Sequence, residues 1–133
     1  MVSPLGMGRI LLIEDDDAIR QLLMENLARD GHAVTTAGNG REGVERFRPG
    51  AYDLVITDLV MPEKEGIEVV QDLRARDPGL KVLAMSGGGH FGAAETYLRL
   101  ASLLGAGRVL AKPFTPAQFL AAVKEALKEE TPG

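Results

Sequence analysis

Strand-like runs of four or five residues alternate five times with longer segments that carry apolar residues at helical spacing. The runs expected to form strands are 9–13, 33–37, 53–57, 81–85 and 108–111. The segments expected to form helices are 17–31, 40–50, 65–79, 90–107 and 115–130. Strands that alternate with helices build a parallel sheet covered by helices on both faces. The sequence therefore predicts an α/β fold with a doubly wound, five-stranded parallel sheet.

The length of 133 residues suits one domain with a buried core. We expect a flexible leader over residues 1–8, one folded domain over 9–130 and a short tail over 131–133. The leader lacks the basic and apolar stretches of a signal peptide, and no apolar run approaches the roughly 20 residues that span a bilayer. The chain has no cysteine, which fits a reducing compartment. We therefore expect a cytoplasmic protein without a membrane partner.

The charge and aromatic content argue against direct binding of nucleic acid. The formal net charge is −4, and no cluster of five or six basic residues provides a face that would neutralise phosphates. Aromatic residues make up 5% of the chain, too few for a platform on which bases stack.

Polar side chains stand directly after four of the five expected strands. Glu14 and Asp15 follow the first strand, Asp58 the third, Ser86 the fourth and Lys112 the fifth. Ligands of open α/β sheets bind beyond the carboxyl ends of the strands, near the point where the strand order reverses. If the strands are parallel, these five side chains converge on one edge of the sheet.

This set of side chains suits phosphoryl transfer to a carboxylate. Three carboxylates held together repel one another, and a hard divalent cation relieves the repulsion. Oxygen ligands in an incomplete cage favour magnesium. Lys112 would balance the remaining charge, and the hydroxyl of Ser86 beside three glycines leaves room for an oxyanion. An anionic aspartate would then act as the nucleophile while the cation and the lysine neutralise the phosphoryl oxygens.

Simpler interpretations explain part of the pattern. Acids at a helix N-terminus are favoured by the helix dipole, which accounts for Asp17 and in part for Asp16. The dipole does not account for acids that coincide with Asp58 and Lys112. We interpret His32 as a surface or strand-edge residue and His90 as a polar residue of a glycine-rich loop.

Four stretches in this order resemble the receiver domain of two-component response regulators, of the stand-alone, single-domain type. They are ILLIEDDDAIR, DLVITDLVMPEKEG, VLAMSG and GAGRVLAKPF, and the resemblance runs from about residue 9 to residue 130. It implies a flavodoxin-like sheet with strand order 2-1-3-4-5. It also implies a metal site in which Asp15 binds Mg²⁺ directly, Glu14 binds it through water, and Asp58 and the main-chain carbonyl of Val60 complete the protein ligands.

The resemblance further assigns the phosphoryl chemistry. Asp58 corresponds to the phosphoacceptor, Ser86 to the hydroxyl residue that binds the phosphoryl group, and Lys112 to the lysine that contacts it. Pro62 and Gly66 would shape the loop after Asp58, and the bond before Pro113 is usually cis in this family.

The implied function is signalling rather than turnover of an external substrate. A histidine kinase or a phosphotransfer protein would donate the phosphoryl group, and transfer and later dephosphorylation would be self-catalysed. Output would pass to a downstream protein partner, and a homodimer is compatible with the resemblance.

Two features depart from the commonest receiver pattern. Val109 stands three positions before Lys112, where many receivers carry an aromatic residue that rotates on activation. Ser86 and Lys112 are separated by 112 − 86 = 26 positions, a few more than usual, with the excess in GGGHFGAAETYL. The mode of switching and the usual dimer geometry therefore do not follow from the resemblance.

Two other functions remain open from the residues alone. One is a binding module that is never phosphorylated, although such modules tend to lose the acidic set. The other is a small hydrolase with an aspartyl-phosphate intermediate, which leaves Asp58 unexplained and lacks the length for a substrate-selecting cap.

Overall fold

The computed structural model describes residues 8–59, 66–87 and 108–128. Its strands are β1 (Arg9–Ile13), β2 (Ala33–Ala37), β3 (Leu54–Asp58), β4 (Val82–Gly87) and β5 (Arg108–Lys112). Its helices are α1 (Asp17–Arg29), α2 (Gly40–Arg46), α3 (Gly66–Arg76) and α5 (Pro116–Lys128). The helix expected over 90–107, His90, and the leader and tail (except Gly8) lie outside the described residues. Within those residues no helix has the length and apolar character needed to cross a membrane.

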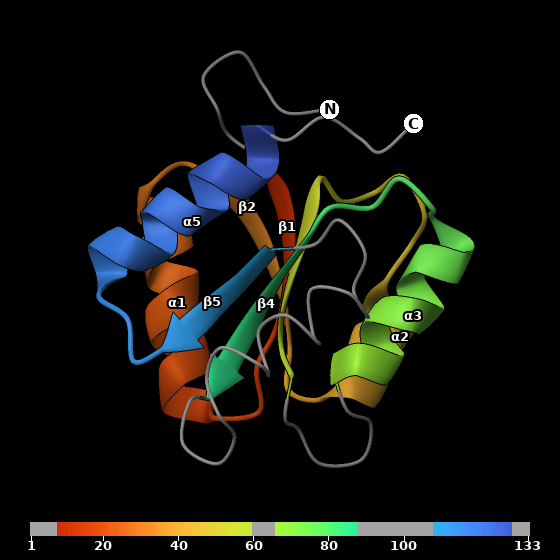
Figure 1. Cartoon of the computed structure of the whole chain (residues 1–133), viewed down its shortest axis with the longest axis horizontal. Helices are drawn as coiled ribbons and strands as arrows, with labels where there is room; N and C mark the ends of the chain where they lie inside the picture. The colour runs from red at the N-terminus through yellow and green to blue at the C-terminus, as the bar shows by residue number, and fades with distance from the viewer. Residues whose placement is uncertain (1–7, 60–65, 88–107, 129–133) are drawn as a thin grey trace.

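All strands pair in parallel in the order β2-β1-β3-β4-β5, so the predicted fold class and strand order are confirmed (Figure 1). The order reverses at β1, because β2 lies on one side of it and β3 on the other. In the β1–β3 register Ile13 pairs with Thr57, so both strands reach the same edge of the sheet together.

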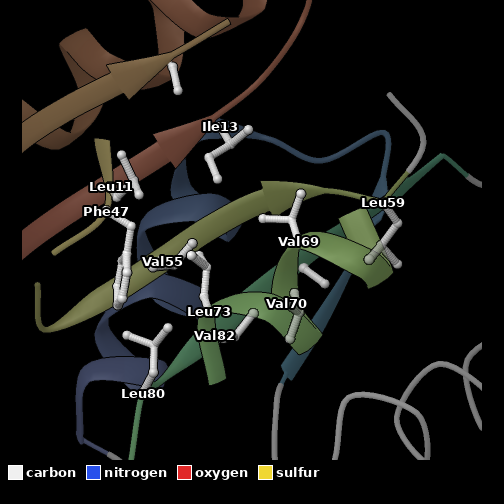
Figure 2. Packing of buried hydrophobic residues seen from close by; sticks show 12 residues of the cluster. Leu11, Ile13, Phe47, Val55, Leu59, Val69, Val70, Leu73, Leu80 and Val82 are labelled. Atoms are coloured by element: carbon white, nitrogen blue, oxygen red, sulfur yellow. The ribbon is translucent and has the colours of Figure 1, made fainter. Parts of the chain in front are cut away.

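Alternate side chains of the sheet enter two separate cores, as the period of two in a strand requires. Leu11 and Ile13 of β1 pack with α3 and with Phe47 after α2, whereas Ile10 and Leu12 pack with α1 and α5. Figure 1 shows these helix pairs on opposite faces of the sheet, and Figure 2 shows the first core. The residues labelled there are Leu11, Ile13, Phe47, Val55, Leu59, Val69, Val70, Leu73, Leu80 and Val82. Both faces are covered, which explains why the central strands are continuously apolar.

Side-chain caps fix where the helices begin. Asp16 accepts a hydrogen bond from the N–H of Ile19 at 3.0 Å and starts α1, which leaves the two preceding acids at the end of β1. Thr115, the expected cap of the last helix, accepts from the N–H of Gln118 at 3.0 Å. The Gln118 side chain accepts in return from the N–H of Thr115 at 2.8 Å. Such reciprocal caps satisfy main-chain donors that the helix leaves unpaired.

α2 is shorter at its C-terminal end than expected, because the predicted helix included Phe47 and stopped at the proline and glycine that follow. α2 ends at Arg46 because Phe47 is extended, with φ −67° and ψ 137°. The proline at position 49 disfavours a helical residue before it, and Gly50 has φ 78°. The chain thus leaves α2 early and turns toward β3.

Of the two interpretations of His32, the surface one is wrong, whereas the strand-edge one holds because His32 directly precedes the edge strand β2. Its side chain is 4% exposed, and Nδ1 accepts a hydrogen bond from the N–H of Gly8 at 2.9 Å. The Gly8 carbonyl in turn accepts from the N–H of Ala33 at 3.0 Å, so His32 helps to hold the start of β1 against β2. Burial lowers the pKa of His32, although nearby Asp30 opposes the shift.

We predict that His32 makes stability depend on pH below neutrality. The folded state prefers the neutral ring, so its contribution is full above the ordinary pKa near 6.5 and is lost as the pH falls below that value. His32→Asn keeps an acceptor for Gly8 but does not titrate. The free energy of unfolding, measured by urea titration from about pH 7.5 to 5.5, should fall more for the parent than for the variant. The difference should reach at most roughly 1 kcal/mol, the contribution of one hydrogen bond. Parallel pH profiles would contradict the prediction.

Candidate functional site

Three acids meet at the carboxyl edge of the sheet. Glu14 and Asp15 follow β1, and Asp58 is the last residue of the adjacent β3. One carboxylate oxygen of each lies within 4.8 Å of the others. The expected convergence of these acids is therefore present in the fold.

Lys112 reaches the same acids from β5. Its Nζ donates to Oδ2 of Asp58 at 2.6 Å and lies 3.6 Å from Oε2 of Glu14. β4 separates β3 from β5, so the side chains of Lys112 and Asp58 together bridge about two strand spacings, roughly 10 Å. Burial alone would lower the pKa of Lys112, but the hydrogen bond and charge of Asp58 outweigh burial and raise it. Lys112 is thus a permanent cation at this edge.

Glu14 is the most buried acid of the site. It is 1% exposed, and burial raises its pKa to about 7, against the opposing charge of Lys112 and with further upward pressure from Asp58. Its Oε1 accepts a 3.4 Å hydrogen bond from the N–H of Asp16. Its Oε2 is buried and accepts no hydrogen bond from the described residues. An acceptor left in this state is expected to bind a ligand or water.

The donor set fits a hard divalent cation. The three carboxylates offer oxygen ligands, and Asp15 is exposed while Glu14 and Asp58 are buried. A cation held from one side in this way keeps coordinated water on the other, as Mg²⁺ prefers. The buried Oε2 of Glu14, which lies 3.6 Å from Lys112 Nζ, would also gain a ligand where no described residue donates a hydrogen bond to it.

The structure describes some of the remaining predicted site residues and not others. The backbone of Ser86 pairs with Ala111, whereas its side chain, Val60 and Pro62 lie outside the described part of the chain. The Lys112–Pro113 bond is cis, as the resemblance implied. Val109 is half-buried in β5 against the core that contains Leu11, in place of an aromatic residue.

The sequence interpretation missed Arg20. Its guanidinium donates from Nη1 to the main-chain oxygen of Glu14 at 2.9 Å and from Nη2 to Oδ1 of Asp17 at 2.5 Å. The only signal was a basic residue three positions after an acid on the first turn of a helix, which occurs on many helix surfaces.

Gly66 allows α3 to start directly against the backbone of Asp58. Its N–H donates to the Leu59 carbonyl at 3.1 Å. A Cβ at this position would overlap the carbonyl oxygen of Asp58 and lie 2.6 Å from Cα of Leu59. Both obstacles are main-chain atoms, so any larger residue would displace the site.

Comparison with known proteins identifies the family of this arrangement. The family model of the response regulator receiver domain matches residues 10–124. The DNA-binding transcriptional regulator NtrC of Azospirillum brasilense is 36% identical over 92% of this chain and 25% of its own length. The chemotaxis protein CheY of Thermotoga maritima is 32% identical over 92% of this chain and 100% of its own. The HemR receiver domain of Leptospira biflexa, 30% identical, superposes with a TM-score of 0.82 over 94% of this chain and 98% of that domain.

The chain belongs to the family of response regulator receiver domains. Membership gives its class of function, phosphoacceptor signalling in two-component systems, and these matches support that class over the hydrolase and the unphosphorylated module. The chain spans a quarter of NtrC and about half of several other curated relatives. What those longer proteins do as a whole is a separate question from what this domain does.

We predict that Gly66→Ala destabilises the fold and disturbs the site more than Gly43→Ala does. The added methyl at residue 66 meets main chain, which cannot move aside, and overpacking of this kind costs about 1–3 kcal/mol. At Gly43, inside α2, the added methyl meets Cδ1 and Cγ1 of the buried Ile13, a side chain that can shift more easily than main chain, and alanine gains about 1 kcal/mol of helix propensity. Denaturant midpoints and amide shifts of Asp58 would measure the difference. Equal losses in the two variants would contradict it.

Proposed function

We propose that Asp58 is the residue that accepts the phosphoryl group. The observation that carries this proposal is the pairing of its carboxylate with Lys112 Nζ at 2.6 Å beside the two acids that follow β1. Asp58 is buried with a lysine partner but beside two further acids, and packing alone gives no reason to gather three acids at one edge of the sheet. A functional role gives such a reason.

The transfer follows from the groups present. A carboxylate oxygen of Asp58 attacks the phosphorus of a phosphohistidine, the P–O bond forms, the P–N bond breaks, and the imidazole leaves with its electron pair and takes a proton from water. Lys112, already bound to Asp58, remains positive throughout and offsets the negative charge of the phosphoryl oxygens. Ser86, at the end of β4, is the proposed hydroxyl donor to the same group.

Mg²⁺ is the proposed cofactor. Asp15, Asp58 and the carbonyl of Val60 would hold it directly, and Glu14 through water. When bound, it neutralises the phosphoryl oxygens as they develop charge. The three acids keep the site anionic, and Lys112 keeps Asp58 oriented for attack.

The proposed partners are proteins. A histidine kinase or phosphotransfer protein donates the phosphoryl group, and a downstream protein responds to the phosphorylated state, in the cytoplasm and without direct contact to nucleic acid. The domain acts on itself: it catalyses its own phosphorylation and the later hydrolysis of the acyl phosphate. The phosphoryl group would shift an equilibrium between two conformations of the domain, and this shift would change its contacts with the downstream protein.

We predict one phosphoryl group on the parent chain after incubation with Mg²⁺ and acetyl phosphate, and none on Asp58→Asn, because an amide is not a nucleophile for this transfer. Intact mass spectrometry measures both. Asp16→Asn is the matched control, since asparagine caps α1 as well as aspartate does and the same charge is lost nearby. Lack of an adduct on the parent, with a phosphohistidine donor also failing, would leave the unphosphorylated binding module as the better account.

We also predict that Asp15→Asn weakens Mg²⁺ binding by about tenfold or more, because supporting residues of metal sites already cost 10–100-fold and a direct ligand costs no less. Calorimetric titration of the unphosphorylated protein gives the dissociation constant. Asp16→Asn should change it far less, since its side chain caps the helix instead of facing the acids. Equal weakening in the two variants would show that only the net charge of the loop matters.

A further inference from the structure

Arg20 binds the main chain between the two acids that follow β1. Its side chain is 24% exposed, and Nη1 donates to the Glu14 carbonyl at 2.9 Å. Its Nη2 donates to Oδ1 of Asp17 at 2.5 Å, which holds the guanidinium from the other side. Arg20 also lies against the loop after β2, because a Cβ added to Gly38 would be 3.5 Å from Nη1. The guanidinium therefore donates to two acceptors, the Glu14 carbonyl and the Asp17 carboxylate, and lies beside the loop after β2.

The backbone at Glu14 and Asp15 requires such support. Consecutive side chains of an extended strand point to opposite faces, yet carboxylate oxygens of these two residues and of Asp58 lie within 4.8 Å of one another. The chain bends at Asp15 to achieve this. The N–H of Glu14 still donates to Ala37 of β2 at 3.1 Å, but its carbonyl has left the sheet and accepts from Arg20 instead.

From this geometry we propose that Arg20 is a positioning residue for the magnesium site: it fixes the peptide plane between Glu14 and Asp15 and so directs both carboxylates toward Asp58. The inference rests on the proposed function. Arginine suits this task because its planar fork binds two acceptors in fixed directions, which a lysine ammonium does not.

The direction in which Mg²⁺ affinity changes on substitution distinguishes the proposed role of Arg20 from an effect of its charge alone. A cation beside a metal site repels Mg²⁺, so loss of the charge alone would tighten binding. Loss of the contact to the Glu14 carbonyl frees the peptide plane and would weaken binding. The two explanations therefore predict changes of opposite direction for the same substitution.

The experiment compares Mg²⁺ dissociation constants of the parent, Arg20→Gln, Arg20→Lys and Arg29→Gln by calorimetry at one ionic strength, with thermal unfolding of each. Arg29, exposed in the last turn of α1, provides the same change of charge away from the site. We expect binding by Arg20→Gln to weaken about tenfold, as for other residues that orient metal ligands. We expect Arg20→Lys to be weakened although its charge is kept, and Arg29→Gln to match the parent.

Amide shifts of Glu14 and Asp15 supply a second measurement for any variant of low stability. They should move in Arg20→Lys before Mg²⁺ is added, and not in Arg29→Gln. Unchanged or tighter binding by Arg20→Gln, in a setting where the parent binds Mg²⁺, would overturn the role of Arg20 alone. Failure of the parent to bind Mg²⁺ would overturn the proposed function and this inference with it.

Discussion

The parallel pairing of β1 with β3 is the constraint on which the site depends. Because Ile13 pairs with Thr57, the acids that follow β1 and the acid that ends β3 arrive at one edge together. Their mutual repulsion would oppose this pairing if nothing balanced it. Lys112 supplies the balance from β5, with a hydrogen bond to Asp58 that ties the two strands on either side of β4. The charges of the site and the order of the sheet are thus parts of one arrangement.

The burial of the acid Glu14 lowers the stability of the fold. A buried acceptor without a hydrogen bond destabilises a fold by about 1–3 kcal/mol, and Glu14 Oε2 is such an acceptor among the described residues. Apolar side chains of β1 fill both cores immediately before it, whereas the Glu14 side chain lies beside Asp58 and Lys112. A chain that keeps an acid at this position gives up stability where a ligand would restore it. Local departures of this kind from the rules of folding are typical of functional sites.

The sequence was informative where one strong rule decided the outcome. Apolar runs predicted the strands. The rule that polar side chains at the carboxyl ends of parallel strands converge predicted that Asp58 and Lys112 lie together. The sequence did not predict hydrogen bonds between a side chain and a main-chain group of another segment. His32 was interpreted as a surface or strand-edge residue because it precedes a strand, and its burial was missed because its partner is the N–H of Gly8, 24 residues away in sequence. Arg20 was missed because its acceptor is a carbonyl group, which every residue carries and no sequence pattern marks.

Lys112 and Arg20 contact the site in different ways: Lys112 donates to a carboxylate, and Arg20 donates to a main-chain carbonyl. Lys112 contacts the carboxylate of Asp58 itself, so a change of charge on Asp58 acts directly on the end of β5. Val109 lies in the same strand against the core, without the aromatic ring that many receivers use there. If Asp58 is phosphorylated as proposed, we expect the Lys112 contact to respond directly, because Lys112 donates to the Asp58 carboxylate whereas Arg20 donates to the main chain of Glu14.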